Sequence, residues 1–322
     1  MRGETVQQPR ATEVYARIAE NVQGVLRGKP EVVRLAVAAL LAEGHLLIED
    51  VPGLGKTTLA RCLARSIGGT WNRIQFTPDL LPGDITGVMV YHQNNERFEF
   101  HPGGIFANVV LADEINRGTP KTQSALLEVM SERRATVDSV AHDVPHPFLV
   151  IATQNPIEME GTYRLPEAQL DRFLMRIAVG YPDHQAELEV IMRACAGYGP
   201  DELSPVVDLV TLRAAIDEVR EARLDPAILS YAVRLAEYTR EHAEVRFGAS
   251  PRGSIALVRA AQAIAATEGR AYVTPDDIKL VAKPVLAHRL VLTADAELNQ
   301  REPAGVVQEA LDKTPAPAIS AV

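Results

Sequence analysis

The residues with the clearest chemical potential lie at positions 50–57, which read DVPGLGKT. A hydrophobic run at 45–48 precedes them and a helix-like segment at 58–64 follows. Strand, glycine loop ending in Gly-Lys-Thr, and helix is the order that a phosphate-binding loop requires. Glycines let successive backbone N–H groups turn towards phosphate oxygens, and the helix N-terminus adds partial positive charge. We therefore expect this loop to bind a nucleoside triphosphate.

Within the loop, two side chains carry the expected chemistry. We expect Lys56 to reach the β- and γ-phosphates and the Thr57 hydroxyl to ligate Mg²⁺. Asp50 stands where the full pattern has glycine, and a carboxylate beside phosphates is unfavourable unless its side chain points away. The alternative is an exposed Gly/Pro turn with an incidental Gly-Lys-Thr. The other expected nucleotide contacts are Pro52, Gly53, Leu54, Gly55 and Thr58.

Polar residues also follow two later hydrophobic runs. Residues 108–114 end in Asp113 and Glu114, and residues 148–155 end in Asn155. Side chains just beyond the carboxyl ends of parallel strands converge on the ligand crevice. We expect Asp113 to hold Mg²⁺, which prefers hard oxygen ligands, and Glu114 to act as the general base for water. We expect Asn155 to bind the γ-phosphate or to orient that water; a simple turn is its alternative.

The elements that must position these residues alternate between strand-like and helical patterns. This alternation predicts an α/β domain with a mostly parallel sheet over residues 1–183. From residue 184 helical periodicity dominates, which predicts a helical bundle over 184–312, followed by a mobile tail at 313–322. The expected strands are 45–49, 73–76, 108–112, 148–152 and 177–179. The expected helices are 12–26, 31–43, 122–133, 184–195, 209–220, 226–241, 252–267 and 275–289.

Two further segments read as β-hairpins, one near 84–101 and one near 135–146, because apolar runs flank a polar tip. Four histidines lie within or beside these hairpins. They are too scattered, without supporting cysteine or carboxylate spacing, to predict a zinc site. These histidines are His92, His101, His142 and His146.

Composition narrows the class of protein. A net charge of −9 and 5% aromatic residues argue against a protein held to nucleic acid mainly by phosphate neutralisation. Two cysteines far apart in sequence fit a reducing compartment. The sequence contains no apolar run long enough to span a membrane, and the N-terminus lacks the apolar stretch of a signal peptide. We therefore expect a cytoplasmic protein.

Taken together, the motifs resemble those of the MoxR family of AAA+ ATPases over nearly the whole chain. The resemblance implies a P-loop NTPase αβα core with a parallel sheet, followed by an all-α lid domain. It also implies Walker A roles for Lys56 and Thr57, Walker B roles for Asp113 and Glu114, and the sensor 1 role for Asn155. The stretches that carry it are 49–57, 113–117, 152–156, 165–173 and 248–252.

The resemblance assigns two arginines to the γ-phosphate. It implies that Arg172 is an arginine finger that enters the site of a neighbouring subunit, where it stabilises transition-state charge. It implies that Arg252 is sensor 2, which reaches the γ-phosphate from the lid of the same subunit. The alternatives are an ion pair of Arg172 with Asp171 or Glu167, and an ordinary exposed helix-start arginine at Arg252.

These expectations combine into a Mg²⁺-dependent ATPase that forms a homo-oligomer, usually a hexameric ring in the family. By resemblance, the hairpins are the helix-2 and pre-sensor 1 inserts, and hydrolysis drives chaperone-like remodelling of a protein client. Such clients often contain a von Willebrand factor A domain. One alternative is a nucleic-acid-dependent ring motor, which the acidic charge disfavours. The other is a nucleotide-gated scaffold with little turnover, although every expected catalytic residue type is present.

Overall fold

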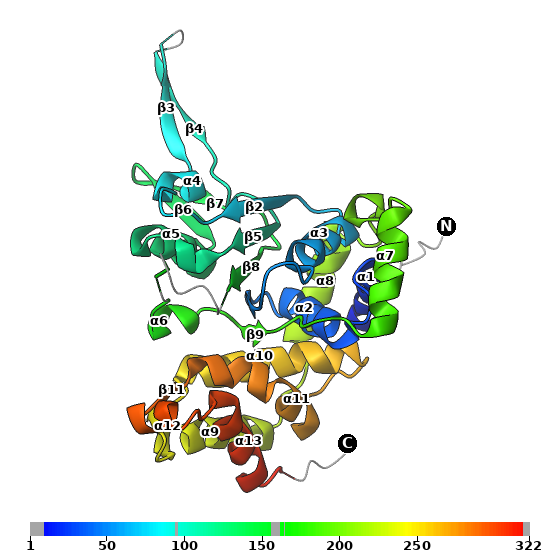
Figure 1. Cartoon of the computed structure of the whole chain (residues 1–322), viewed down its shortest axis with the longest axis vertical. Coiled ribbons are helices and arrows are strands. Elements are labelled where there is room, and N and C mark those ends of the chain that lie inside the picture. Colours follow the sequence, from blue (N-terminus) through cyan, green and yellow to red (C-terminus); the bar gives the residue numbers. More distant parts are fainter. Residues whose placement is uncertain (1–9, 94–95, 156–161, 164, 318–322) are drawn as a thin grey trace, which may run out of the picture.

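A five-stranded parallel sheet forms the centre of the larger body of the molecule (Figure 1). The computed structural model describes residues 10–93, 96–155, 162–163 and 165–317. The strand order is β2-β5-β8-β1-β9, and every neighbouring pair is parallel. The strands are β1 (Leu46–Glu49), β2 (Trp71–Gln75), β5 (Val109–Asp113), β8 (Leu149–Gln154) and β9 (Met175–Ile177).

Helices cover both faces of this sheet. Successive strand side chains point to opposite faces, so Leu46 and Ile48 enter one hydrophobic cluster while Leu47 enters the other. The first cluster contains side chains of α1, α2 and α3, and the second contains those of α5. The predicted αβα layering is therefore confirmed. The helices of this region are α1 (Ala11–Gln23), α2 (Pro30–Leu41), α3 (Lys56–Ser66), α4 (Pro82–Thr86), α5 (Pro120–Glu132) and α6 (Glu167–Leu170), with the 3₁₀ turn η1 (Ile115–Arg117).

The chain after residue 184 is helical, as expected, but its helices lie in two places. The first two, α7 (His184–Cys195) and α8 (Leu209–Arg220), lie beside α1, and α8 packs directly against it (Figure 1). The later helices form the separate lower body, which also holds a short ribbon of β10 (Val245–Phe247) and β11 (Val291–Leu292). They are α9 (Pro226–Glu241), α10 (Pro251–Thr267), α11 (Pro275–Leu286), α12 (Ala294–Leu298) and α13 (Pro303–Lys313), with the 3₁₀ turn η3 (Ala287–Arg289). A further 3₁₀ turn, η2 (Pro200–Glu202), lies between α7 and α8 and contacts α3 of the core.

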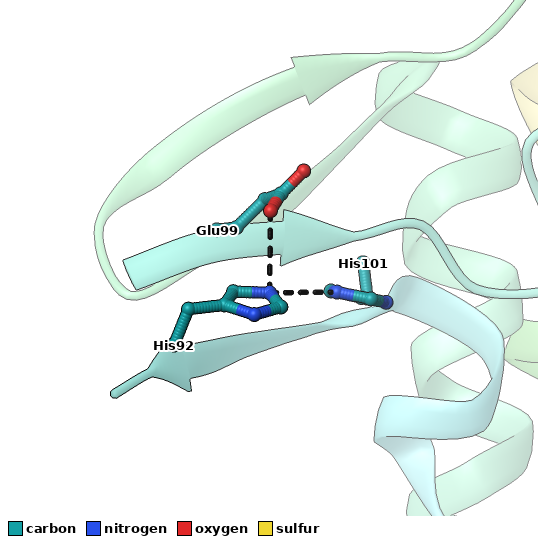
Figure 2. Close-up of side chains that lie close together, drawn as sticks. All are labelled: His92, Glu99 and His101. Atoms are coloured by element: carbon teal, nitrogen blue, oxygen red, sulfur yellow. Dashed lines mark hydrogen bonds and ion pairs between the residues drawn. The ribbon is translucent and has the colours of Figure 1, made fainter. Parts of the chain in front are cut away.

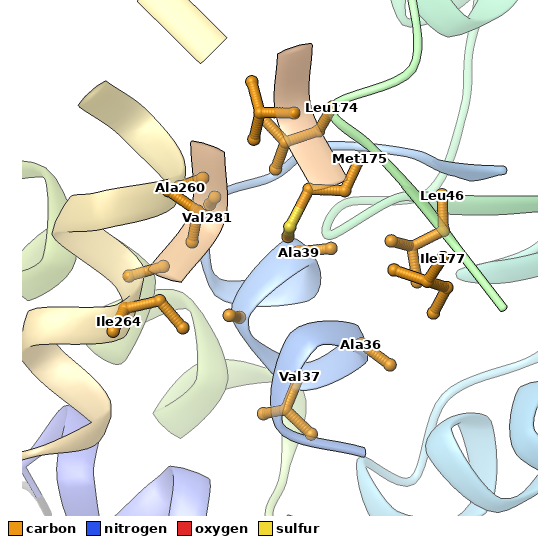
Figure 3. Close-up of a cluster of buried hydrophobic side chains, with 14 of the residues drawn as sticks. Ala36, Val37, Ala39, Leu46, Leu174, Met175, Ile177, Ala260, Ile264 and Val281 are labelled. Atoms are coloured by element: carbon orange, nitrogen blue, oxygen red, sulfur yellow. The ribbon is translucent and has the colours of Figure 1, made fainter. Parts of the chain in front are cut away.

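Small apolar side chains join the lower body to the core. Figure 3 shows Ala39 of α2 beside Met175 of β9, with Ala36 of α2 and Ala260 and Ile264 of α10 in the same cluster. Because interiors are close-packed, such a contact positions α10, and with it Arg252, against the core.

At the chain's end, Thr314 is buried and its N–H donates to the Ala310 carbonyl, while residues 318–322 lie outside the described part.

Two antiparallel hairpins extend from the core. One pairs β3 (Val88–His92) with β4 (Arg97–His101) and projects far from the sheet in Figure 1; the other pairs β6 (Arg134–Val137) with β7 (Val140–Asp143). Among the described residues, we find no helix with the length and hydropathy needed to cross a bilayer.

Candidate nucleotide site

The glycine loop adopts a conformation that its sequence makes accessible. Gly53 and Gly55 have φ of 87° and 90°, in the left-handed region where glycine carries no steric penalty. Gly55 immediately precedes α3, which begins at Lys56, so the loop ends at a helix N-terminus. The Lys56 ammonium donates to the Asp50 carbonyl at 2.7 Å, which turns the lysine back over the loop. Backbone donors, helix terminus and ammonium are thus gathered in one short segment.

The Asp50 carboxylate points away from this loop. Its Oδ2 accepts hydrogen bonds from the N–H groups of Val179 and Gly180 at 2.8 and 2.7 Å, and its Oδ1 accepts one from Val51 at 3.0 Å. These donors offset the negative charge, which removes the conflict with phosphate that the sequence raised. Asp50 therefore ties the start of the loop to the segment that follows β9.

Three strand ends meet at the edge where this loop begins. β5, β8 and β1 are consecutive in the sheet, and all three run in the same direction. Asp113 is the last residue of β5, Asn155 directly follows β8, and the loop directly follows β1. Asp113 and Asn155 are both buried. The Thr153 hydroxyl donates to Asp113 Oδ1 at 2.6 Å, which fixes the orientation of the carboxylate. The predicted convergence of these segments is thus present.

Residues on β2 that the sequence reasoning missed contact both acids. Arg73 Nε donates to Asp113 Oδ2 at 3.1 Å, and Gln75 Nε2 donates to Glu114 Oε2 at 3.0 Å. Arg117 also donates to Glu114 Oε2, at 3.0 Å. Arg73 and Gln75 are two positions apart and therefore share one face of β2. That spacing was readable in the sequence, but the pairing of β2 with β5 was not.

A cavity of about 560 Å³ opens beside the same edge, between the core and the lower body. Its volume is within the range of small-molecule sites. Asn155, Glu49 and Arg176 line it from the core, and Glu49 and Arg176 form an ion pair at 2.8 Å. His288 and Arg301 are among the residues that line it from the lower body. Lys56 and Thr57 are not among its lining residues, so the phosphate loop adjoins this cavity rather than forming its wall.

The two predicted arginines lie elsewhere. Arg172 and Arg252 line a second cavity of about 300 Å³, together with His45 and Leu174, which precede β1 and β9. This cavity is therefore at the amino edge of the sheet. The phosphate loop begins at Asp50, five residues beyond His45, which in a strand corresponds to about 16 Å. The structure does not bring Arg252 to the loop of its own chain, so the expected sensor 2 contact within one subunit does not fit this geometry.

Neither of the ion pairs considered for Arg172 is the contact that the structure shows. Arg172 Nη1 donates to the Leu127 carbonyl of α5 at 2.6 Å and to the Ser131 hydroxyl. Asp171 instead accepts from Arg289 Nε at 2.8 Å and from the Ser250 hydroxyl at 2.9 Å. Asp171 thereby links the core to the lower body. Arg172 is not paired with it and lines the second cavity.

The second cavity is rich in positive charge. Five arginines and two acids line it, and burial lowers the pKa of three of these guanidinium groups. The cause is the loss of solvent around the charged groups, since Arg133 and Arg289 still have acidic partners in Glu43 and Asp171. The arginines are Arg133, Arg172, Arg252, Arg259 and Arg289, of which the first and the last two have the lowered pKa; the acids are Glu43 and Asp171.

The expectation that the histidines are scattered fails for one pair. His92 and His101 lie close together on the β3–β4 hairpin, with Glu99 beside them. The other two are apart from this group: His142 stacks on Phe100, and His146 pairs with Glu43.

Comparisons with known proteins agree with this architecture. Residues 45–175 match the model for the "ATPase family associated with various cellular activities (AAA)", and residues 237–310 match that for the "AAA lid domain". The chain is 48% identical to the uncharacterized protein YeaC of Bacillus subtilis, over 94% of this chain and 95% of the relative. It is 42% identical to the protein named Chaperone MoxR1 of Mycobacterium tuberculosis, over 97% of this chain and 85% of the relative. A crystal structure from Cytophaga hutchinsonii superposes with a TM-score of 0.90 at 36% identity, and covers 96% of each chain. The chain therefore belongs to the MoxR family of AAA+ ATPases.

Proposed function

We propose that this chain binds ATP with Mg²⁺ and hydrolyses it to ADP and phosphate. The observation that carries the proposal is the meeting of the phosphate loop with the ends of β5 and β8 at one edge of the sheet. Hydrogen-bond donors for phosphate, carboxylates and a buried amide come together there from three separate parts of the chain. Parallel sheets bind their ligands at this carboxyl edge.

The residues at this edge fit a nucleotide with its metal ion. The Thr57 hydroxyl and the Asp113 carboxylate are the hard oxygen ligands that Mg²⁺ prefers, and Thr153 holds the carboxylate in place. Bound there, Mg²⁺ would neutralise charge on the β- and γ-phosphates. Lys56 adds a cation from the first turn of α3, and Asn155 contributes an amide from the neighbouring strand.

Glu114 is the proposed general base. Gln75 and Arg117 both donate to its Oε2, so Oε1 is the oxygen that we assign to the attacking water. The carboxylate accepts a proton from the water as the water oxygen bonds to the γ-phosphorus. The bond between this phosphorus and the β–γ bridging oxygen breaks, and ADP is the leaving group. The backbone N–H of Glu114 donates to the Thr153 hydroxyl at 2.8 Å, which links the position of the base to that of Asp113.

The arginine-rich cavity supports assembly into a homo-oligomer. Its excess of guanidinium groups favours an anionic occupant, and it lies at the edge opposite its own phosphate loop. We propose that Arg172 and Arg252 both contact the γ-phosphate held by a neighbouring subunit. Each nucleotide would then lie between two chains, as in a closed ring. A hexamer is the ring size that the family resemblance suggests.

We further propose that hydrolysis drives chaperone-like remodelling of a protein client. Support comes from the relative named Chaperone MoxR1 and from the projecting β3–β4 hairpin, whose Tyr91 and Phe98 are 49% and 66% exposed. The proposal that the client contains a von Willebrand factor A domain rests on the family resemblance alone. The proposal that the protein is cytoplasmic rests on its composition. A nucleic-acid-dependent motor remains the alternative; stimulation of the ATPase by DNA would favour it.

Phosphate release by wild type and Glu114→Gln tests the proposal. We expect a fall of at least about 100-fold in the variant, because the base is lost while the site keeps its shape. Glu221→Gln, an exposed acid after α8, is the matched control and should retain full activity. ATP binding should persist in Glu114→Gln, which also makes it the variant for client capture. Equal rates in wild type and Glu114→Gln would remove Glu114 from this role.

A further inference from the structure

The β3–β4 hairpin carries two chemically different faces. Its register pairs Val88 with His101, Val90 with Glu99 and His92 with Arg97. Directly paired residues point to the same side of an antiparallel ribbon, and so do residues two positions apart. His92, Glu99 and His101 therefore share one face. The opposite face carries an aromatic pair, Tyr91 and Phe98, with ring centroids 5.1 Å apart.

The three polar side chains on the first face converge on one point, as Figure 2 shows. His92 Nε2 lies 3.2 Å from Glu99 Oε2 and 3.5 Å from His101 Nε2. For a tetrahedral zinc ion with bonds of about 2.0–2.1 Å, neighbouring ligand atoms are about 3.3 Å apart. The two separations in the structure, 3.2 and 3.5 Å, bracket this value. The third ligand atom also lies within 4.8 Å of the other two.

Hydrogen bonding alone satisfies this arrangement poorly. His92 Nε2 is within reach of a carboxylate oxygen and of a second imidazole nitrogen. A neutral imidazole nitrogen either donates one hydrogen bond or accepts, so His92 Nε2 can donate to one of these neighbours but not to both. A cation placed among the three atoms would take a lone pair from each. Glu99 would supply a negative charge to offset part of the charge of a divalent ion.

We propose that His92, Glu99 and His101 form a binding site for a divalent transition-metal ion of the zinc class. Two imidazoles and one carboxylate suit zinc, copper or nickel better than Mg²⁺ or Ca²⁺, which favour all-oxygen sets. Glu99 and His101 are exposed, so a water molecule can complete the coordination. This site is separate from the nucleotide site and does not depend on the proposed ATPase activity.

A bound metal ion would cross-link the two strands of the hairpin. His92 belongs to β3, whereas Glu99 and His101 belong to β4, so one ion joins the two strands. Isolated two-stranded ribbons have marginal stability in water, and this hairpin projects away from the sheet. A bound ion therefore reduces its opening and holds Tyr91 and Phe98 on the opposite face.

Zinc titration of metal-free, tag-free protein tests the site. The background should carry Cys195→Ser, because Cys195 is an exposed free thiol that could bind zinc by itself. We expect one ion per subunit by calorimetry, and an affinity at least about 10-fold lower in His92→Ala and in His101→Ala. His184→Ala, an exposed histidine at the start of α7, is the matched control and should bind as the background does.

Amide hydrogen exchange supplies a second readout that does not use activity. We expect zinc to slow exchange in 88–92 and 97–101 in the background protein and to have no such effect in His101→Ala. Circular dichroism of each variant checks that it is folded. Saturable zinc binding of equal affinity in both histidine variants and the background would overturn the proposal. The same conclusion would follow if the background bound no zinc, or if zinc left exchange in both strands unchanged.

Discussion

The position of Arg252 predicts that it acts on the nucleotide of a neighbouring subunit. The perturbation is Arg252→Ala, studied alone and in mixtures with Glu114→Gln. In the structure Arg252 shares a cavity with Arg172 at the amino edge of the sheet, whereas the phosphate loop starts about 16 Å away along β1. That separation exceeds the reach of the side chain, so a contact within one subunit would require the lower body to move.

The expected recovery of activity can be calculated. Removing an arginine that stabilises transferred phosphoryl charge costs about 10³–10⁵ in rate, so each variant alone should be nearly inactive. In a randomly mixed ring, a site works when its own chain keeps Glu114 and the neighbouring chain keeps Arg252. Each condition holds with a probability of one half in an equal mixture, so about one quarter of the sites are active. If Arg252 acted within its own chain, each chain would lack one required residue and no site would recover.

The assay is steady-state phosphate release after the two variants are mixed under conditions that allow subunit exchange. Arg172→Ala with Glu114→Gln is the parallel mixture, and it should show the same recovery. Arg246→Ala, an exposed arginine on β10, should remain active alone and serves as the control for loss of a lid charge. Recovery with Arg172→Ala but none with Arg252→Ala would refute the assignment of Arg252 to the neighbouring site.

Two further predictions concern stability. Asp50→Ala removes the acceptor for the Val179 and Gly180 N–H groups, and should lower the free energy of unfolding by about 2–4 kcal/mol in urea titrations. Asp50→Asn keeps one side-chain oxygen as an acceptor and should be destabilised less. Equal stability of wild type and both variants would contradict this role of Asp50. His45 is buried, and burial lowers its pKa to about 4 from 6.5 while its Nδ1 accepts from the Val150 N–H. The folded state favours the neutral ring, so the contribution of His45 to the free energy of unfolding is complete above pH 6.5. Between pH 6.5 and 4 the unfolded state binds the proton and the folded state does not, so the free energy of unfolding should fall by about 3 kcal/mol. His45→Gln should flatten this part of the stability profile, and parallel profiles would argue against the assignment.

Local patterns were sufficient for the central fold. The hydrophobic runs at 45–49, 108–112 and 148–152 are buried strands because such runs leave no polar face for solvent. Gly53 and Gly55 marked the loop because the left-handed backbone there suits glycine. Periodicity located the longer helices up to α11, but α4, α12, α13 and β10 went unpredicted. α4 and α12 have five residues each and β10 has three, which is too few for a periodic signal.

The parts of the site that escaped prediction depend on contacts between distant segments. Arg73 reaches Asp113 only because β2 pairs with β5, a choice of neighbours that no local pattern encodes. The place of Arg252 follows from how α10 packs against the core. His92 and His101 are close together because the hairpin register places them on one face and because their rings stack across it. Residue types and short spacings thus determined which chemical groups the chain possesses, while the packing of sheet, hairpin and lower body decided which groups share a site.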